Sequence, residues 1–146
     1  FWMKDEFPDV DIDKVIRMCL IHDLGECFIG DIPTFAKTDA DEAREEAELM
    51  AWVRSLPEPV SGEMEALYRE MIALETPEAK LYKAMDKLEA IVQHNESDIA
   101  TWEPHEYQLN MTHADDAVAW SPVLRELREA IRNDTKAKIA AAEQQA

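Results

Sequence analysis

Apolar residues recur every three or four positions along most of the chain, which is the spacing of one face of a helix. These runs end at prolines and glycines, because neither residue continues a helix well. The pattern therefore predicts helices at residues 11–27, 39–56, 61–74 and 77–96, and a long last helix from residue 122 into the C-terminal tail.

Local start signals support these bounds. Asp11 or Asp13 can cap the first helix, and both Thr76-Pro77 and Ser121-Pro122 place a capping hydroxyl before a proline at the first helical position. Residues 97–111 have no clear period, so we expect a loop there with a turn of helix. Together these signals predict an all-α bundle of five or six helices.

Composition limits the choice of fold and partners. A chain of 146 residues has the size of one domain, so residues 1–146 are expected to form a single domain. Its 32 acidic residues against 15 Lys and Arg give a net charge of −17, which repels nucleic acid and anionic lipid surfaces and disfavours both as partners. No apolar run is long enough to cross a bilayer and nothing resembles a secretory signal, so we expect a cytoplasmic protein.

The first predicted helix carries ionisable groups on its apolar face. At about 100° per residue, three such groups fall within its apolar stripe. A lone buried carboxylate costs several kcal/mol, so partners are required, and a metal ion or a water-filled cleft would supply them. The alternative is that the helix rotates near its end and exposes all three groups to water. The apolar stripe is Ile12, Val15, Ile16, Cys19 and Leu20, and the ionisable groups are His22, Asp23 and Glu26.

The adjacent His22 and Asp23 suit a metal site. An imidazole nitrogen and a carboxylate oxygen form a mixed donor set, which favours Mn, Co, Fe, Ni or Zn over Ca. Glu26 lies one turn from His22 and would stand beside the ion without binding it. That is the position of a general acid or base.

These residues belong to a longer pattern that resembles a known family. His22-Asp23-Leu24-Gly25-Glu26, followed by Gly30-Asp31-Ile32-Pro33-Thr34, resembles the HD-domain metal-dependent phosphohydrolases, most closely their 5′-deoxynucleotidase branch. The pattern extends over thirteen residues, which makes it much more specific than a His-Asp dipeptide. The resemblance covers most of the chain and weakens after about residue 96. It implies an all-α HD-domain fold.

The resemblance also implies one divalent metal ion. The candidate metals are then Mn, Co, Fe, Ni, Zn or Mg. The ligands of this ion would be a His from an early helix, His22, Asp23 and a later Asp, which here is Asp86. The periodicity of residues 77–96 does not single out Asp86, which without the resemblance would be an ordinary solvated residue. No His precedes His22, so we expect the upstream ligand in an N-terminal helical segment outside these residues; the alternative is a degenerate site.

The three later histidines do not match the order of ligands in the family. Each is expected to have a surface or core role. They are His94, His105 and His113.

Substrate contacts are likewise implied by the resemblance. Asp31, Pro33 and Thr34 would lie beside the sugar and phosphate of a nucleotide, and Asp31 could accept a hydrogen bond from a sugar hydroxyl. Glu26 and Asp31 are the catalytic candidates, with the division of their roles undecided, and Asp31 could instead be a loop or capping residue. Lys37 and Lys83 are weaker candidates for contacting the phosphate.

Three functions remain in view. The primary hypothesis is a metal-dependent phosphomonoesterase that hydrolyses (deoxy)nucleoside 5′-monophosphates, as a homodimer if it follows the family. The second keeps the site but changes the substrate to another phosphate ester, such as a nucleoside triphosphate or a cyclic nucleotide. The third is a non-catalytic helical module that binds a protein partner through its acidic surface and has a vestigial site.

Overall fold

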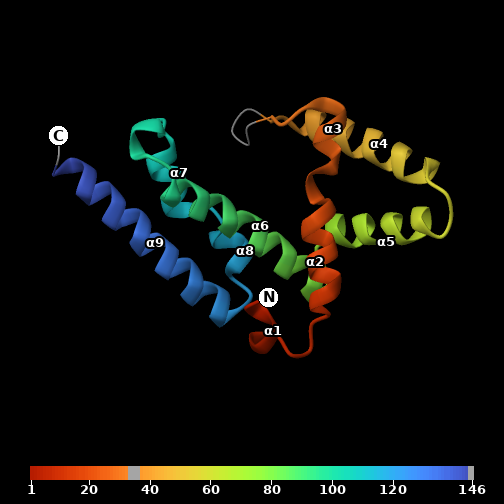
Figure 1. Ribbon diagram of the computed structural model, residues 1–146, viewed down its shortest axis with the longest axis horizontal. Helices are drawn as coiled ribbons and strands as arrows, with labels where there is room; N and C mark the ends of the chain where they lie inside the picture. The colour runs from red at the N-terminus through yellow and green to blue at the C-terminus, as the bar shows by residue number, and fades with distance from the viewer. Residues whose placement is uncertain (33–36, 145–146) are drawn as a thin grey trace. The chain divides into compact units, whose positions relative to one another are not determined.

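The computed structural model describes residues 1–32 and 37–144. This part of the chain is helical and holds no β-strand, which confirms the predicted fold class (Figure 1). None of its helices is long and apolar enough to span a membrane. The longer helices are α2 (Ile12–Ile21), α4 (Asp39–Ser55), α5 (Val60–Ala73), α6 (Pro77–Glu96) and α9 (Pro122–Glu143). Short elements are α1 (Met3–Glu6), η1 (His22–Gly25), α3 (Glu26–Ile29), η2 (Ile99–Thr101), α7 (Glu106–Thr112) and α8 (Asp115–Val118).

The predicted helix starts are confirmed by their caps. The Asp11 carboxylate accepts a hydrogen bond from the Lys14 backbone N–H at 3.0 Å, at the start of α2. The Thr76 hydroxyl accepts from the Ala79 N–H at 3.2 Å before α6. Ser121 accepts from the Leu124 N–H before α9. Each side chain satisfies one of the backbone donors that a helix start leaves without a partner in the helix.

The prediction of one continuous helix over residues 11–27 is wrong after Ile21. The α-helix ends at Ile21, a 3-10 turn follows in η1, and α3 then adds one short helical segment that ends at Ile29, before Gly30, whose φ is 86°. Side chains compete for the backbone at this junction: the Tyr68 hydroxyl of α5 donates to the Ile21 carbonyl at 2.6 Å, and the His22 ring contacts the Cys19 carbonyl. The spacing of apolar residues along the chain does not predict these hydrogen bonds.

The predicted apolar stripe of this helix also needs correction. Val15 and Met18 are its buried residues, whereas Leu20 is 75% exposed. Two residues along a helix turn by about 200°, so Leu20 lies almost opposite Met18. Ile12, Ile16 and Cys19 are partly buried, so the predicted stripe is rotated toward Leu20 relative to the buried face, because Met18 was not counted in it.

The segment at residues 97–111 is more ordered than predicted. It contains η2 and α7 where a loop with a turn of helix was expected. The local sequence is a weak helix former, and α7 instead depends on arginines of α9 that bond its last carbonyls.

The chain forms two compact units. Residues 9–79 make one, and residues 1–8 with 80–146 make the other. In the first, α4 and α5 run antiparallel beside each other (Figure 1), and α2 and η1 pack against them. Its apolar core comes from α2, α4 and α5, with one residue from the start of α6. Its buried apolar side chains are Val15, Met18, Leu49, Met50, Val53, Tyr68, Met71 and Ala79. A single domain over residues 1–146 stays a prediction.

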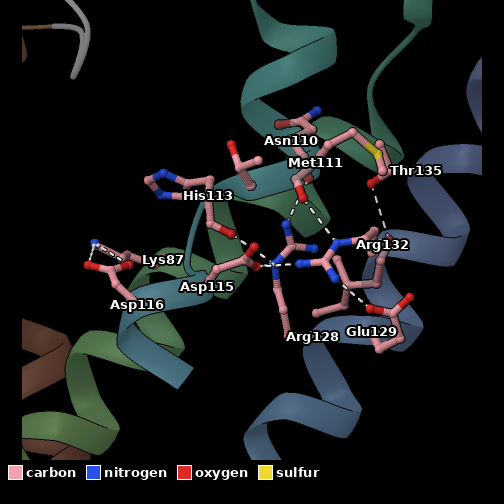
Figure 2. A network of polar contacts seen from close by, with 12 residues as sticks. Lys87, Asn110, Met111, His113, Asp115, Asp116, Arg128, Glu129, Arg132 and Thr135 are labelled. Carbon is pink, nitrogen blue, oxygen red and sulfur yellow. Dashed lines mark hydrogen bonds and ion pairs between the residues drawn. The ribbon is translucent and has the colours of Figure 1, made fainter. Parts of the chain in front are cut away.

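In the second unit, α7 and α8 pack on α9, and a buried arginine holds them there (Figure 2). Arg128 is 2% exposed; its Nε donates to the His113 carbonyl at 2.8 Å and its Nη2 to the Asn110 carbonyl at 3.0 Å. Arg132 Nε donates to the Met111 carbonyl at 3.0 Å, and Asp115 pairs with both arginines. The two arginines thus satisfy carbonyls at the C-terminal end of α7, which no intrahelical donor reaches.

Candidate functional site

Three of the predicted site residues lie close together in the unit of residues 9–79. His22 begins η1, Asp23 follows it, and Glu26 is the first residue of α3. His22 and Glu26 are partly buried, whereas the Asp23 side chain is 60% exposed. The prediction that all three point to the core is therefore wrong for Asp23. A partly open site suits a group that must meet a ligand from solution.

The two ring nitrogens of His22 have different partners. Nδ1 lies 2.8 Å from the Cys19 carbonyl oxygen, and because a carbonyl only accepts, Nδ1 must carry the hydrogen and donate it. Nε2 lies 3.0 Å from Asp23 Oδ2. In the neutral ring Nε2 is then a lone-pair donor that faces an anionic oxygen, and this arrangement needs a proton or a metal cation between the two atoms.

The geometry of the pair fits a divalent ion. Two ligands about 2.1 Å from one ion and at about 90° to each other are about 3.0 Å apart, which is the separation observed here. An imidazole whose second nitrogen donates to a backbone carbonyl is also the usual arrangement of a metal-binding histidine, because that bond fixes the tautomer and the ring. His22 and Asp23 therefore suit two positions in one coordination sphere.

The pair supplies two ligands, and a complete metal site needs more. Within the described residues of either unit, no three His, Cys, Asp or Glu side chains are grouped as a metal site. Asp86 lies on α6 in the unit that contains residues 80–146, is partly buried, and accepts a bond from Lys83 Nζ at 2.7 Å. Its place beside His22 stays a prediction, as does the upstream His.

Glu26 is held among other carboxylates. Partial burial raises the pKa of Glu26 above its ordinary value, and the negative charges of Asp23, Asp31 and Glu45 raise it further. The positive charge of Lys37 acts in the opposite direction. A carboxyl group that keeps its proton more readily than usual is suited to proton transfer.

The remaining candidates are placed as follows. Asp31 is exposed and follows Gly30, and its negative charge contributes to the raised pKa of Glu26. Pro33 and Thr34 lie outside the described residues, so their predicted substrate contacts are untested. Lys37 and Lys83, the candidates for contacting phosphate, each form an ion pair, Lys37 with Glu45 and Lys83 with Asp86.

The three later histidines lie in the unit of residues 80–146. The His94 ring lies beside the Trp102 ring in a tilted arrangement, with 5.8 Å between ring centroids. His105 is exposed at the start of α7, and the carbonyl of His113 accepts from Arg128. Burial, and then the charge of Lys87, lower the pKa of His113.

Sequence reasoning missed Glu45 and Tyr68. Glu45 lies against Gly25, and Tyr68 bonds the last carbonyl of α2. Neither belongs to the motif at residues 22–34, and Glu45 is one of many acidic residues on α4. The small residue at position 25, inside the motif, was the only sequence signal that another side chain comes close.

Comparisons with known proteins agree with the pattern at residues 22–34. A family model described as HD domain matches residues 1–128. A 5′-deoxynucleotidase from Bos taurus is 34% identical over 95 residues, which cover 64% of this chain and 45% of that protein. Others come from Homo sapiens (34% identical, 58% and 42% covered) and Schizosaccharomyces pombe (29% identical, 59% and 46% covered). The chain spans less than half the length of these relatives, and no solved structure matches it.

Proposed function

The chain belongs to the HD domain family, and from this premise we propose that it is a metal-dependent phosphomonoesterase that hydrolyses deoxynucleoside 5′-monophosphates to nucleoside and phosphate. The observation that carries the proposal is the His22–Asp23 pair, in which Nε2 faces a carboxylate oxygen at 3.0 Å while Nδ1 donates to a backbone carbonyl. The similarity to 5′-deoxynucleotidases supports the substrate class.

His22, Asp23 and Asp86 would hold one divalent ion, together with a His from outside these residues. Such an ion, when bound, polarises phosphoryl oxygens and lowers the pKa of water. The net charge of −17 repels an anionic substrate such as a nucleotide. A cation bound at the site would offset this repulsion locally.

Glu26 has the properties of the proton-transfer group. Partial burial, and then the charges of the neighbouring carboxylates, raise the pKa of its carboxyl group above the ordinary value. It can therefore hold a proton for the leaving oxygen or take one from the attacking water. Asp31 is the second candidate for this role and the proposed partner of a sugar hydroxyl, with Pro33 and Thr34 beside it.

Phosphate release from a panel of substrates tests the proposal. The full-length protein is assayed with deoxy- and ribonucleoside monophosphates, a triphosphate and a cyclic nucleotide, each with added Mn, Co or Mg. The proposal predicts fastest release from the deoxy series. Release from the triphosphate or the cyclic nucleotide alone would move the activity to another phosphate ester, and no release with no bound metal would favour the non-catalytic module.

A further inference from the structure

Gly25 occupies a position whose backbone does not require glycine. Its φ of −59° and ψ of −33° are ordinary helical values that alanine adopts at lower entropic cost. The residue is buried, and a Cβ built there would lie 2.6 Å from Glu45 Oε1 and 2.7 Å from Glu45 Cγ. The glycine therefore provides space for the Glu45 side chain.

Glu45 fills this space as half of an ion pair. Lys37 Nζ lies 2.6 Å from Glu45 Oε2, and the two side chains are only 22% and 14% exposed. The hydrogen bond to Glu45 raises the pKa of Lys37, so the lysine stays charged. A pair this close and this sheltered from solvent is held more rigidly than a surface salt bridge.

The ion pair lies against the segment that carries Glu26. Gly25 directly precedes Glu26, and α4, which carries Glu45, packs on both η1 and α3. The rings of Phe28 on α3 and Trp52 on α4, 6.1 Å apart, hold the same two helices together. The charges of Glu45 and Lys37 both act on Glu26, in opposite directions, beside those of Asp23 and Asp31.

We propose that the Lys37–Glu45 ion pair, seated in the space that Gly25 leaves, positions the Glu26 carboxyl group for phosphate-ester hydrolysis. This inference rests on the proposed function. It makes Lys37 and Glu45 positioning residues that act through Glu26, and it gives Lys37 a role other than contact with the phosphate.

The first test uses charge removal in the full-length protein. Lys37→Met leaves the Glu45 charge uncompensated and raises the pKa of Glu26, so the pH profile of kcat should move to higher pH. Glu45→Gln removes a negative charge and should move it to lower pH, and these directions hold whether Glu26 acts as acid or base. At the parental optimum, kcat should fall by about tenfold or more in each variant, with KM changed by less than about threefold.

A conservative variant and the opposite pH shifts of the two charge-removing variants distinguish a positioning role from loss of structure. Lys37→Arg keeps the charge and should restore most of kcat. If Lys37→Met and Glu45→Gln move the pH profile in the same direction, or leave kcat at the parental value, the inference is overturned. A change in KM alone would also overturn it, because that result indicates direct contact with the substrate.

The second test addresses Gly25. Gly25→Ala should displace Glu45 and lower kcat by about tenfold or more. In a Glu45→Ala background the same substitution meets no carboxylate and should cause no further loss. Gly62→Ala is the matched control, because Gly62 is exposed in the first turn of α5 and a Cβ there would lie 3.1 Å from Oε2 at the end of the Glu58 side chain. An equal loss for Gly25→Ala in both backgrounds would contradict the role of Glu45.

The activity of the parent protein distinguishes failure of the proposed function from failure of the positioning role of Lys37 and Glu45. A parent protein without activity on any phosphate ester overturns the proposed function and the inference with it. An active parent whose Lys37→Met and Gly25→Ala variants keep the parental kcat and pH profile overturns the inference alone.

Discussion

At the residue scale, the hydrogen bond between His22 and the Cys19 carbonyl determines which ring nitrogen of His22 faces Asp23. The Cys19 carbonyl can only accept, so it fixes the hydrogen on Nδ1 and leaves the Nε2 lone pair toward Asp23. That His22, Asp23 and Glu26 lie close together was predictable from sequence, because they share a short motif. The contact between Gly25 and Glu45 was not, because twenty residues separate the two and Glu45 resembles its solvated neighbours on α4.

Substitutions at Asp23 and at Glu26 should have different effects on metal binding and on turnover. Asp23→Ala removes a proposed ligand, so the purified variant should not retain metal and should release no phosphate. Glu26→Gln keeps the size of the side chain and the ligands, so it should retain metal while kcat falls by about 10²–10⁴-fold. Metal content and initial rates measured on the same samples check both. Full activity in Glu26→Gln would remove Glu26 from the mechanism.

Glu26 should also affect stability in a pH-dependent way. Its pKa in the folded chain is raised by burial and by neighbouring carboxylates, so the folded state favours the protonated form. Stability from Glu26 is therefore present below its unfolded pKa and is lost as the pH rises through the folded pKa. Glu26→Gln should raise the Tm relative to the parent more at pH 7 than at pH 4, measured with chelator present. An equal difference at both pH values would contradict the raised pKa.

At the element scale, long helices with caps were predictable and short ones were not. The starts of α2, α6 and α9 follow from capping residues, which in α6 and α9 precede a proline at the first helical position. The break before η1 and the presence of α7 depend on side chains from other helices. Tyr68 of α5 bonds the Ile21 carbonyl before η1, and Arg128 of α9 bonds the Asn110 carbonyl in α7. Periodicity cannot report such bonds, because it describes one segment at a time.

The buried arginine of α9 gives a stability prediction for this element. Arg128→Met removes the donors to the His113 and Asn110 carbonyls, and buried acceptors without partners are costly. We expect the free energy of unfolding to fall by about 3 kcal/mol in denaturant titrations. Arg125→Met is the control on the same helix, where the arginine is exposed, and it should cost less than about 1 kcal/mol. Equal losses in the two variants would show that the buried bonds do not stabilise α7.

At the scale of the whole molecule, charge is the dominant feature. The excess of acidic residues gives a net charge of −17, and a compact chain of this charge repels itself. The family match spans both compact units.

Self-repulsion predicts a response to salt. With chelator present, raising NaCl from about 0.02 M to about 0.3 M shortens the screening length to below about 10 Å and should raise the Tm by about 2 °C or more. Thermal unfolding followed by circular dichroism measures this change. A Tm that falls with salt would indicate that attractive ion pairs, such as Lys37–Glu45, outweigh the repulsion.

The most direct test of a metal-dependent hydrolase is phosphate release from a deoxynucleoside 5′-monophosphate by the full-length protein, before chelation, after chelation and after the metal is restored. We expect release that stops with chelator, returns with one equivalent of a divalent ion, and is absent from Asp23→Ala under all three conditions. Release that continues in the chelated protein, or that Asp23→Ala retains, would contradict a hydrolase whose metal is held by His22 and Asp23.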